Sequence, residues 1–428
     1  QAEQIETELN RSSAAFAQAT QKVTLEAVQK AIPANAALVE FIEYQPFNPK
    51  APPGQGFGSP RYAVYVLTAT GEPRFADLGS ASEIDASVAQ YRRATLDPRR
   101  PISEAQAAAR ALDAQIMTPV RSLVGNNVNH LLIAPDGQLN LVSFAGLVDE
   151  KNQYLIERYQ ITYLTSGRDL LRLQSTPPNP NPPLIVANPT FDKPGSNPVQ
   201  IASAALDNLR SVDLATIKFG SLPGTAIEGE TIAKLLPNSR LFTQAQATET
   251  VVKNSSNPRI LHLATHGFFL KPAPTTQAKD GSRNLPHENP LLRSGLALAG
   301  FNLRQGGGDD GVLTALEITG MDLRGTQLVV LSACETGLGD VQSGEGVYGL
   351  RRAFTLAGAQ SQVMTLWRVE DEATKDLMVA YYQRLNRGEE RGEALRQAQL
   401  ALLKDARTAH PRFWSGFIFA GDWRRLRP

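Results

Sequence analysis

Cysteine is almost absent from this sequence: the 428 residues include one, Cys334. A single cysteine allows no disulfide within the chain and no cage of cysteine ligands around a metal. A chain without disulfides suits a reducing compartment, and we therefore expect a cytoplasmic protein. The lone thiol is then either a small core residue or a reactive group.

Excess charge of one sign is also absent, as are long apolar runs. Forty-three Lys and Arg residues face 42 Asp and Glu residues, which leaves a formal net charge of +1. So small an excess gives no reason to expect direct contact with nucleic acid or with an acidic membrane surface. No apolar run approaches the roughly 20 residues that cross a bilayer. The chain starts at Gln1 and its first methionine is Met117, so we expect a piece of a longer protein.

The motifs of several enzyme classes are missing. The sequence has no Gly-x-x-x-x-Gly-Lys-Ser/Thr loop for phosphates and no Gly-x-Ser-x-Gly turn of a serine hydrolase. His262 and His266 have the four-residue spacing of a zinc-binding helix. However, Leu263 stands where the general-base glutamate belongs, and the segment has the pattern of a strand. We therefore expect neither a metal nor a cofactor.

The sequence divides into two parts of different pattern. Residues 1–125 combine strand-like and helical stretches around a segment rich in proline and glycine, which is typical of a small α+β lobe. From His130 onward, short apolar strands alternate with helices, which predicts a parallel sheet covered on both faces. The predicted strands of this second part are 130–134, 184–187, 259–264, 327–331, 362–366 and 417–419, and its predicted helices are 227–236, 346–356, 372–386 and 393–403.

Two of the predicted strands lead into reactive residues. One is followed by Thr-His-Gly, with the imidazole at His266, and another by Ser-Ala-Cys, with the thiol at Cys334. In an open parallel sheet, ligands bind outside the carboxyl ends of the strands. An imidazole beside the thiol can take its proton and later protonate a leaving amine. The backbone N–H groups of Gly267 and Cys334 are the candidates for an oxyanion hole.

Both residues have a purely structural alternative. A cysteine at the end of a Leu-Val-Val-Leu strand is often inert core, and a histidine beside a strand is more often a hydrogen-bonded structural group than a base. Here the two occur together, each at a strand end before a glycine turn, with the histidine 68 positions upstream. The caspase signature, a Gln-Ala-Cys-x-Gly run with its histidine about 50 residues upstream, resembles Ser332-Ala-Cys334 and its turn. The combination favours a catalytic pair.

The motifs His262-Leu-Ala-Thr-His-Gly267 and Leu331-Ser-Ala-Cys-Glu-Thr-Gly337, with shorter matches at 131–137, 222–228, 344–352, 365–371 and 414–423, are similar to those of a known family. From His130 to its end, the chain resembles the CHAT group of caspase-like cysteine peptidases, which are often linked to tetratricopeptide repeats. The resemblance implies a caspase-like three-layer α/β sandwich with a mainly parallel central sheet, preceded by the smaller α+β lobe of residues 1–125. It also implies a degenerate caspase-like half at 126–240 and an active half at 241–428, with His266 as base and Cys334 as nucleophile.

The resemblance leaves the specificity of such a peptidase open. Metacaspases carry an acid two residues before the cysteine that helps to bind basic side chains, and here that position is Ser332. Glu345 and Asp371 are the candidates for an acid that selects Arg or Lys, although a capping or solvated carboxylate is the commoner role for each. Trp367 is a candidate wall of the substrate groove, with core packing as the alternative. No third residue that would orient His266 is evident, which predicts a dyad.

We expect a cysteine endopeptidase that cleaves protein or peptide substrates through a thioester on Cys334. The alternative is a non-catalytic caspase-like scaffold for protein–protein interaction. A regulatory partner acting through a repeat region outside this chain is a further expectation. The segments 271–290 and 305–311 are expected sites of autocatalytic cleavage, at Arg283 or Arg304.

Overall fold

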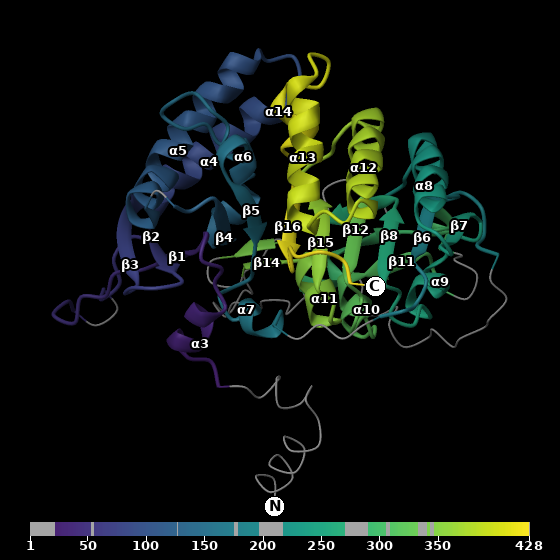
Figure 1. The fold of residues 1–428 in the computed structure, drawn as a ribbon, viewed down its shortest axis with the longest axis horizontal. Helices are drawn as coiled ribbons and strands as arrows, with labels where there is room; N and C mark the ends of the chain where they lie inside the picture. Colours follow the sequence, from purple (N-terminus) through teal and green to yellow (C-terminus); the bar gives the residue numbers. More distant parts are fainter. Residues whose placement is uncertain are drawn as a thin grey trace, which may run out of the picture.

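The computed structural model shows a sheet of eleven strands that extends across the protein (Figure 1). It describes residues 22–52, 55–125, 127–174, 179–196, 217–269, 290–304, 309–332, 340–342 and 346–427. In their order across the sheet, the strands are β3 (Arg74–Ser80), β2 (Arg61–Thr68), β1 (Ala36–Tyr44), β4 (His130–Ala134), β5 (Gln160–Tyr163), β16 (Phe417–Gly421), β15 (Ser361–Thr365), β12 (Leu328–Ser332), β8 (Ile260–Ala264), β6 (Leu184–Pro189) and β7 (Arg240–Gln244).

The sheet is mainly parallel. Its antiparallel pairs are β3–β2, β2–β1 and β16–β15, and every other neighbouring pair is parallel. Strands β1, β4, β5 and β16 therefore run in one direction, and β15, β12, β8, β6 and β7 run in the other. The mixed α/β class with a large, mainly parallel sheet that the sequence predicts is confirmed.

Helices cover both faces of the sheet, which gives three layers (Figure 1). The upper face in this view carries α4 (Ala81–Leu96), α5 (Ile102–Val124), α6 (Leu155–Arg158), α8 (Pro223–Leu235), α12 (Asp371–Asn386), α13 (Arg391–Lys404) and α14 (Pro411–Trp414). The lower face carries α3 (Leu25–Lys30), α7 (Asp169–Arg172), α9 (Glu249–Lys253), α10 (Ala315–Thr319) and α11 (Leu350–Leu356). Short 3₁₀ turns lie at Gly137–Leu141, Phe144–Gly146, Pro290–Leu292 and Phe301–Leu303.

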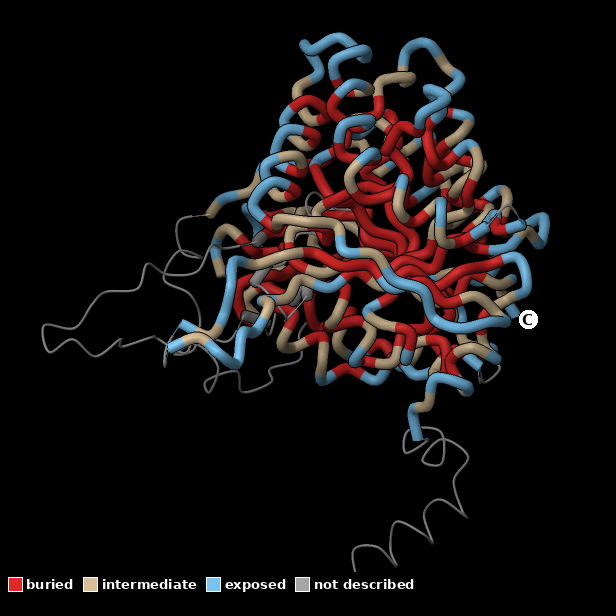
Figure 2. Tube along the Cα trace, turned by 90° about the vertical axis from the view of Figure 1, so that its left-hand side faces the viewer, coloured by how far each residue is buried: buried red, intermediate tan, exposed pale blue. Residues whose placement is uncertain are grey.

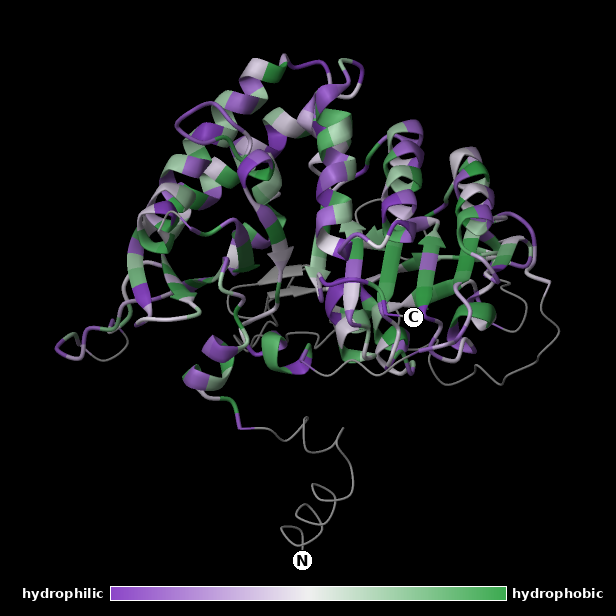
Figure 3. Cartoon of the chain, in the orientation of Figure 1, coloured by the Kyte–Doolittle hydropathy of each residue, from purple (hydrophilic) through white to green (hydrophobic). Residues whose placement is uncertain are grey.

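The core lies between the sheet and the inner sides of the helices (Figure 2). Strand β8 has the sequence Ile-Leu-His-Leu-Ala and β12 has Leu-Val-Val-Leu-Ser, and every residue of both is buried. Continuous apolar runs are what a parallel strand with helices on both sides requires. In Figure 3 the strands of this part are accordingly mostly hydrophobic.

The predicted strands from 130 onward are all present, whereas one predicted helix is shorter than expected. The pattern predicts a helix over 346–356, but residues 346–348 form strand β14 and α11 starts only at Leu350. Gly349 precedes α11 in an extended conformation. Glycine has a low helix propensity, which explains the later start.

The N-terminal strands belong to the same sheet as the rest, because β1 pairs in parallel with β4. Residues 126–240 contribute β4 and β5 to one set of parallel strands and β6 to the other. The division of the chain at 125 and 240 stays a prediction, and the sheet crosses both boundaries.

Two small sheets accompany the large one. Beyond β8, the chain bends at Thr265 and continues as β9 (His266–Phe269), which pairs with β10 (Ser294–Ala297), and β10 pairs with β11 (Val312–Thr314). Strands β13 (Asp340–Gln342) and β14 (Gly346–Tyr348) form an antiparallel pair. No helix within the described residues is both long and apolar enough to span a membrane.

Candidate functional site

Strands β8 and β12 are neighbours in the sheet and end level with each other. They are parallel, and Ala264, the last residue of β8, pairs with Ser332, the last residue of β12. Both strands therefore reach the same edge of the sheet at the same height. His266 follows β8 by two residues. Cys334 follows β12 by two residues, but it lies among residues 333–339, outside the part of the chain that the structure describes.

The ring of His266 is held by a backbone carbonyl. Its Nε2 atom lies 3.0 Å from the carbonyl oxygen of Gly220. A carbonyl oxygen only accepts hydrogen bonds, so Nε2 carries the proton and the neutral ring keeps its lone pair on Nδ1. Burial lowers the pKa of His266 below 6.5, and the charge of Arg368 lowers it further. The hydrogen bond to Gly220 and the charge of Asp371 raise the pKa, but they do not cancel the effect of burial. At neutral pH this imidazole is therefore in its basic, unprotonated form.

The segment that carries Gly220 is fixed by an aromatic cluster and by one amide. The Phe219 ring stacks on the His266 ring, with centroids 4.5 Å apart and planes 14° apart, and Phe191 contacts the same imidazole at 5.3 Å. Asn302 accepts a hydrogen bond from the Phe219 N–H and donates one to the Phe219 carbonyl, both at 2.9 Å. These contacts fix the tautomer and the orientation of His266.

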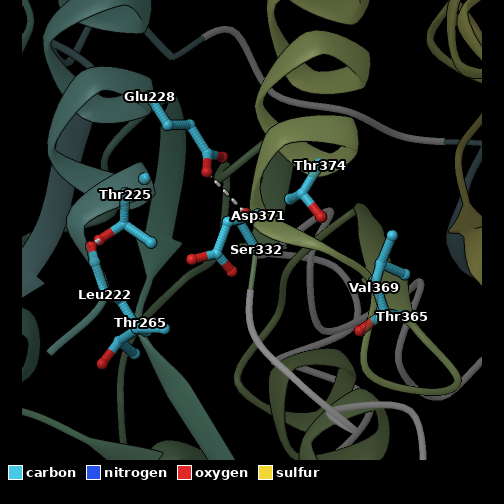
Figure 4. A pocket seen from close by; sticks show the side chains of 10 residues that line it. Leu222, Thr225, Glu228, Thr265, Ser332, Thr365, Val369, Asp371 and Thr374 are labelled. Atoms are coloured by element: carbon cyan, nitrogen blue, oxygen red, sulfur yellow. Dashed lines mark hydrogen bonds between the residues drawn. The ribbon is translucent and has the colours of Figure 1, made fainter. Parts of the chain in front are cut away.

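A small pocket of about 30 Å³ lies at the same edge of the sheet (Figure 4). Its walls come from the ends of β12 and β15, from the bend after β8, and from the first turns of α8 and α12. The lining residues are Leu222, Gly224, Thr225, Glu228, Thr265, Ser332, Thr365, Val369, Asp371 and Thr374. Two lining residues are acids, several carry hydroxyl groups, and none of the described residues that line the pocket is basic. The lining includes the neighbour of His266 and the residue two positions before Cys334.

The first turns of α8 and α12 meet at Gly224. A Cβ atom on Gly224 would lie 2.9 Å from the Cβ atom of Asp371, closer than real Cβ atoms come. Asp371 is the first residue of α12 and is exposed. A carboxylate at a helix N-terminus is favoured by the helix dipole, which is a structural reason for an acid at this position. Asp371 also forms part of the pocket wall.

Four buried polar side chains form a chain beneath the pocket. The Ser332 hydroxyl donates to Glu228 Oε2 at 3.0 Å. Glu228 Oε1 lies 3.2 Å from His262 Nε2, but the two atoms are not aligned for a hydrogen bond. His262 Nδ1 lies 3.1 Å from the hydroxyl of Tyr382. The polar chain, as we call these four residues, connects β12, α8, β8 and α12.

Comparison with known families decides what kind of domain this is. The family profile of the CHAT domain matches residues 106–422, about three quarters of the chain. The protein belongs to the CHAT family. The match includes His266, Cys334 and every residue that lines the pocket, so the resemblance that the two motifs indicate is confirmed.

Two curated relatives of this CHAT protein are named for tetratricopeptide repeats. Tetratricopeptide repeat protein 28 of Homo sapiens is 27% identical over 343 residues, which cover 76% of this chain and 13% of the relative. Its counterpart in Mus musculus is 26% identical over 343 residues, with 76% and 14% covered. The chain thus spans about an eighth of the length of the relatives it matches.

Among solved structures, two that the CHAT protein is similar to at low identity are a gingipain and a separase complex. The Arg-specific cysteine proteinase gingipain R is 8% identical with a TM-score of 0.39, over 81% of this chain and 75% of the other. The separase of the Saccharomyces cerevisiae separase–securin complex is 10% identical with a TM-score of 0.47, over 97% of this chain and 31% of the other. Neither likeness assigns an activity to this chain.

The structure describes some of the residues that the CHAT motifs single out and not others. Cys334 and Glu345 lie outside the described residues. Gly267 is buried in β9, where it pairs with Leu296 of β10. Asp371 lines the pocket together with Thr265, the neighbour of His266. The roles that the sequence suggests for these residues stay predictions.

Trp367 lies in the core. Its side chain is 1% exposed, and its indole N–H donates to the carbonyl of Arg412 at 3.0 Å. It is not among the residues that line the pocket. This placement agrees with the packing alternative, and a role as a wall of the substrate groove stays a prediction without a described contact to support it.

Sequence reasoning missed the groups that hold His266 and most of the polar chain. Gly220 acts through its backbone carbonyl, which no side-chain motif reveals. Asn302 is an ordinary polar residue of a loop in the sequence. His262 had one available signal, a histidine inside an otherwise apolar strand, and its buried partners explain that signal without a metal. Among the described residues, no group of three or more His, Cys, Asp or Glu side chains is arranged to hold a metal ion.

Proposed function

We propose that this CHAT domain is a cysteine endopeptidase in which His266 is the general base and Cys334 the nucleophile. The observation that carries the proposal is the level ending of β8 and β12 at one edge of the sheet. Two residues of extended chain span at most about 7 Å, so a thiol two residues beyond Ser332 remains close to this edge. The wall of the pocket beside this edge is the natural place for a substrate side chain to lie against.

The proposed reaction starts from the neutral imidazole of His266. Its Nδ1 atom takes the proton of the Cys334 thiol, and the thiolate attacks the carbonyl carbon of the scissile peptide bond. The backbone N–H groups of Gly267 and Cys334 stabilise the oxyanion. The imidazolium returns the proton to the leaving amine, and a thioester on Cys334 remains. Water, deprotonated by His266, then hydrolyses the thioester and restores the thiol.

The hydrogen bond between His266 and Gly220 supports this assignment. A catalytic imidazole needs a fixed tautomer, and a second group bonded to its far nitrogen supplies it. Here the second group is a backbone carbonyl, so the catalytic side chains remain a dyad. The Nε2–H donor to Gly220 also strengthens as the ring becomes charged, which stabilises the imidazolium during the reaction.

We propose protein or peptide substrates, with the side chain before the scissile bond lying against the pocket wall, since about 30 Å³ has room for one or two waters. Asp371 on the pocket wall is the proposed acid that attracts Arg or Lys, and Glu345 is the alternative acid. A regulatory partner that acts through repeats in a longer protein remains part of the proposal. The segments 271–290 and 305–311 are proposed cleavage sites, and residues 271–289 and 305–308 of them lie outside the described residues.

A specific observation favours a second candidate, a scaffold without turnover. His266 already has structural contacts on two sides, the carbonyl of Gly220 and the ring of Phe219. A histidine held in this way also stabilises a fold that has no chemistry to perform. The two candidates differ in the state of the thiol, because only a peptidase needs an activated Cys334.

The test compares the wild-type chain with Cys334→Ala and His266→Ala on a protein-derived peptide library. We expect each variant to lower kcat/KM at least about 10⁴-fold, because each removes a member of the catalytic pair. His410→Asn is the control, since it changes a histidine outside the pocket lining and keeps an acceptor for the Arg412 N–H. Cleavage that survives Cys334→Ala ends the proposal.

Alkylation with iodoacetamide separates the peptidase from the scaffold. The chain has one cysteine, so all labelling reports on Cys334. The peptidase predicts labelling well below pH 8.5, the ordinary pKa of a thiol, and its loss in His266→Ala. Labelling that follows the pH profile of a free thiol, together with no cleaved peptide, supports the scaffold.

A further inference from the structure

Glu228 is a buried carboxylate that has no lysine or arginine partner among the described residues. Glu228 is 1% exposed. Among the described residues, the imidazole of His262 is the one group within ion-pair distance that could carry a positive charge. Burying a carboxylate costs several kcal/mol unless hydrogen bonds and an opposite charge compensate it. An apolar side chain of the same size would serve stability as well or better. Stability therefore does not explain why α8 carries an acid here.

Glu228 touches both strands that lead to the proposed catalytic pair. Ser332, which donates to Oε2, is the last residue of β12 and lies two residues before Cys334. His262, beside Oε1, lies in β8 and four residues before His266. One carboxylate from α8 thus contacts the last residue of β12 and the middle residue of β8, as Figure 4 shows for its contact with Ser332.

The far end of the polar chain is anchored in α12. The Tyr382 hydroxyl contacts His262 Nδ1, and Tyr382 is fully buried. Burial raises the pKa of Tyr382 well above 10, so the phenol stays neutral and retains its proton. Helices α8 and α12 also pack against each other. The polar chain therefore connects β12 and β8 to two helices that are themselves in contact.

We propose that Glu228 is a positioning residue, which acts through Ser332 to fix the direction in which β12 leaves the sheet and thus the place of the Cys334 thiol. The proposal rests on the proposed function for the catalytic role of that thiol. Glu228 does not meet the reacting atoms in this scheme. Its hydrogen bond to Ser332 fixes the last residue of β12, two residues before Cys334, and a misplacement of about 1 Å is enough to lower a rate about 100-fold.

The experiment is a double-mutant cycle on Glu228→Leu and Ser332→Ala. Each single variant removes the hydrogen bond, and we expect each to lower the iodoacetamide rate at Cys334 and kcat about 10- to 100-fold. Both effects act through one bond, so the double variant should lose about as much as the more impaired single variant rather than the product of the two losses. Glu228→Gln keeps an oxygen that accepts from Ser332, and it recovers most of the rate that Glu228→Leu loses.

Ser361→Ala is the matched control. The Ser361 hydroxyl is also buried and donates to the carbonyl of Gln327 at 2.6 Å, but it starts β15 at the opposite edge of the sheet. We expect its loss to lower stability and to leave both rates within twofold. A folded Ser332→Ala variant with wild-type rates overturns the proposal, as does a Ser361→Ala variant that loses as much.

The two readouts separate this inference from the proposed function. Alkylation needs no substrate, so it measures the position and state of the thiol in a protein that cleaves nothing. If the wild type cleaves no peptide but Ser332→Ala alters the alkylation profile and Ser361→Ala does not, the peptidase proposal fails and the positioning role stands. If Glu228→Leu does not fold, Ser332→Ala and Glu228→Gln carry the test, because both are small changes in volume. A Gln variant as slow as Ser332→Ala overturns the role of the hydrogen bond.

Discussion

The eleven-stranded sheet consists of two sets of parallel strands that run in opposite directions and meet where β16 pairs with β15. The first set is β1, β4, β5 and β16, with β2 and β3 beside it, and the second is β15, β12, β8, β6 and β7. Their carboxyl ends lie at opposite edges of the sheet. Each edge is therefore a possible binding site by the same topological rule, and the two edges differ in how they are filled.

Part of the carboxyl edge of the first set is covered by its own chain. After β4, the 3₁₀ turns Gly137–Leu141 and Phe144–Gly146 fold over this edge, and tyrosine hydroxyls satisfy their backbone. Tyr62 donates to Asp85 and accepts from the Gln138 N–H, at 3.0 and 2.9 Å. Tyr163 donates to the Val142 carbonyl and accepts from the Phe144 N–H, at 2.9 and 3.0 Å.

The carboxyl edge of the second set keeps a polar pocket. Its floor holds Glu228, and its wall holds Asp371. His266 lies beside it, half-buried, and within the described part of the chain it is hydrogen-bonded through Nε2 alone. The difference shows that a sheet built from two opposed parallel sets offers two such edges, and that loop packing decides which groups each edge presents. The expected degenerate character of residues 126–240 remains a proposal that this contrast motivates.

The largest effect that tests the contrast is expected at Gly137, in the covered part of the first edge. Its φ angle is +54°, and a Cβ atom there would overlap the hydroxyl oxygen of Tyr62. We expect Gly137→Ala to lower the free energy of unfolding by about 3 kcal/mol. Gly71→Ala is the control, because Gly71 also has a positive φ but nothing within 4 Å, and about 1 kcal/mol is expected. If denaturant titrations show the same loss of unfolding free energy for the two variants, the chain is not tightly packed at Gly137.

The next effect concerns His130, the buried histidine of the first set. Burial lowers the pKa of His130 from 6.5 to about 3. The unfolded chain binds the proton more readily than the folded one, so the stability that His130 contributes is complete above about pH 6.5 and is lost as the pH falls toward 3. At pH 5 the loss is about 2 kcal/mol.

Denaturant titrations of the wild type and His130→Gln between pH 7 and 5 measure this loss. The variant lacks the titrating group, so its stability should fall by about 2 kcal/mol less over this range. The pKa of His266 and that of His410 are also lowered by burial, and both residues remain in the variant, so the difference isolates His130. If the free energy of unfolding changes equally with pH in the two proteins, the side chain of His130 does not stay neutral in the fold.

The smallest effect is expected at Asp371, at the carboxyl edge of the second set. We expect Asp371→Asn to lower kcat/KM about tenfold for peptides with Arg or Lys before the scissile bond and less than twofold for neutral ones, because a full charge leaves the pocket wall. Asp376→Asn on the same helix is the control, since Asp376 is exposed and is not in the pocket lining. Equal losses on neutral and basic peptides exclude charge selection by Asp371.

Sequence patterns predicted the parallel strands and the family, and they were less informative about the site. Apolar runs such as Leu-Val-Val-Leu identify buried strands because burial on both faces leaves no room for alternation. No pattern in the sequence predicts that β1–β3 join the same sheet, because an exposed edge strand can pair with any suitable strand. For the site, the motifs pointed to His266 and Cys334, but the bond from His266 to Gly220 involves a backbone atom 46 residues away.

The sequence by itself determined that this chain has one thiol, which strands are buried, and that the histidine and cysteine motifs follow two of them. These properties depend on residues that are close together in the chain. The tertiary structure alone decided that β8 lies beside β12, that the pocket with Asp371 on its wall lies beside His266, and that Glu228 joins the two strands. The contact between Glu228 and Ser332, for example, links residues 104 positions apart. Such contacts arise from the order in which strands and helices pack, which no local pattern specifies.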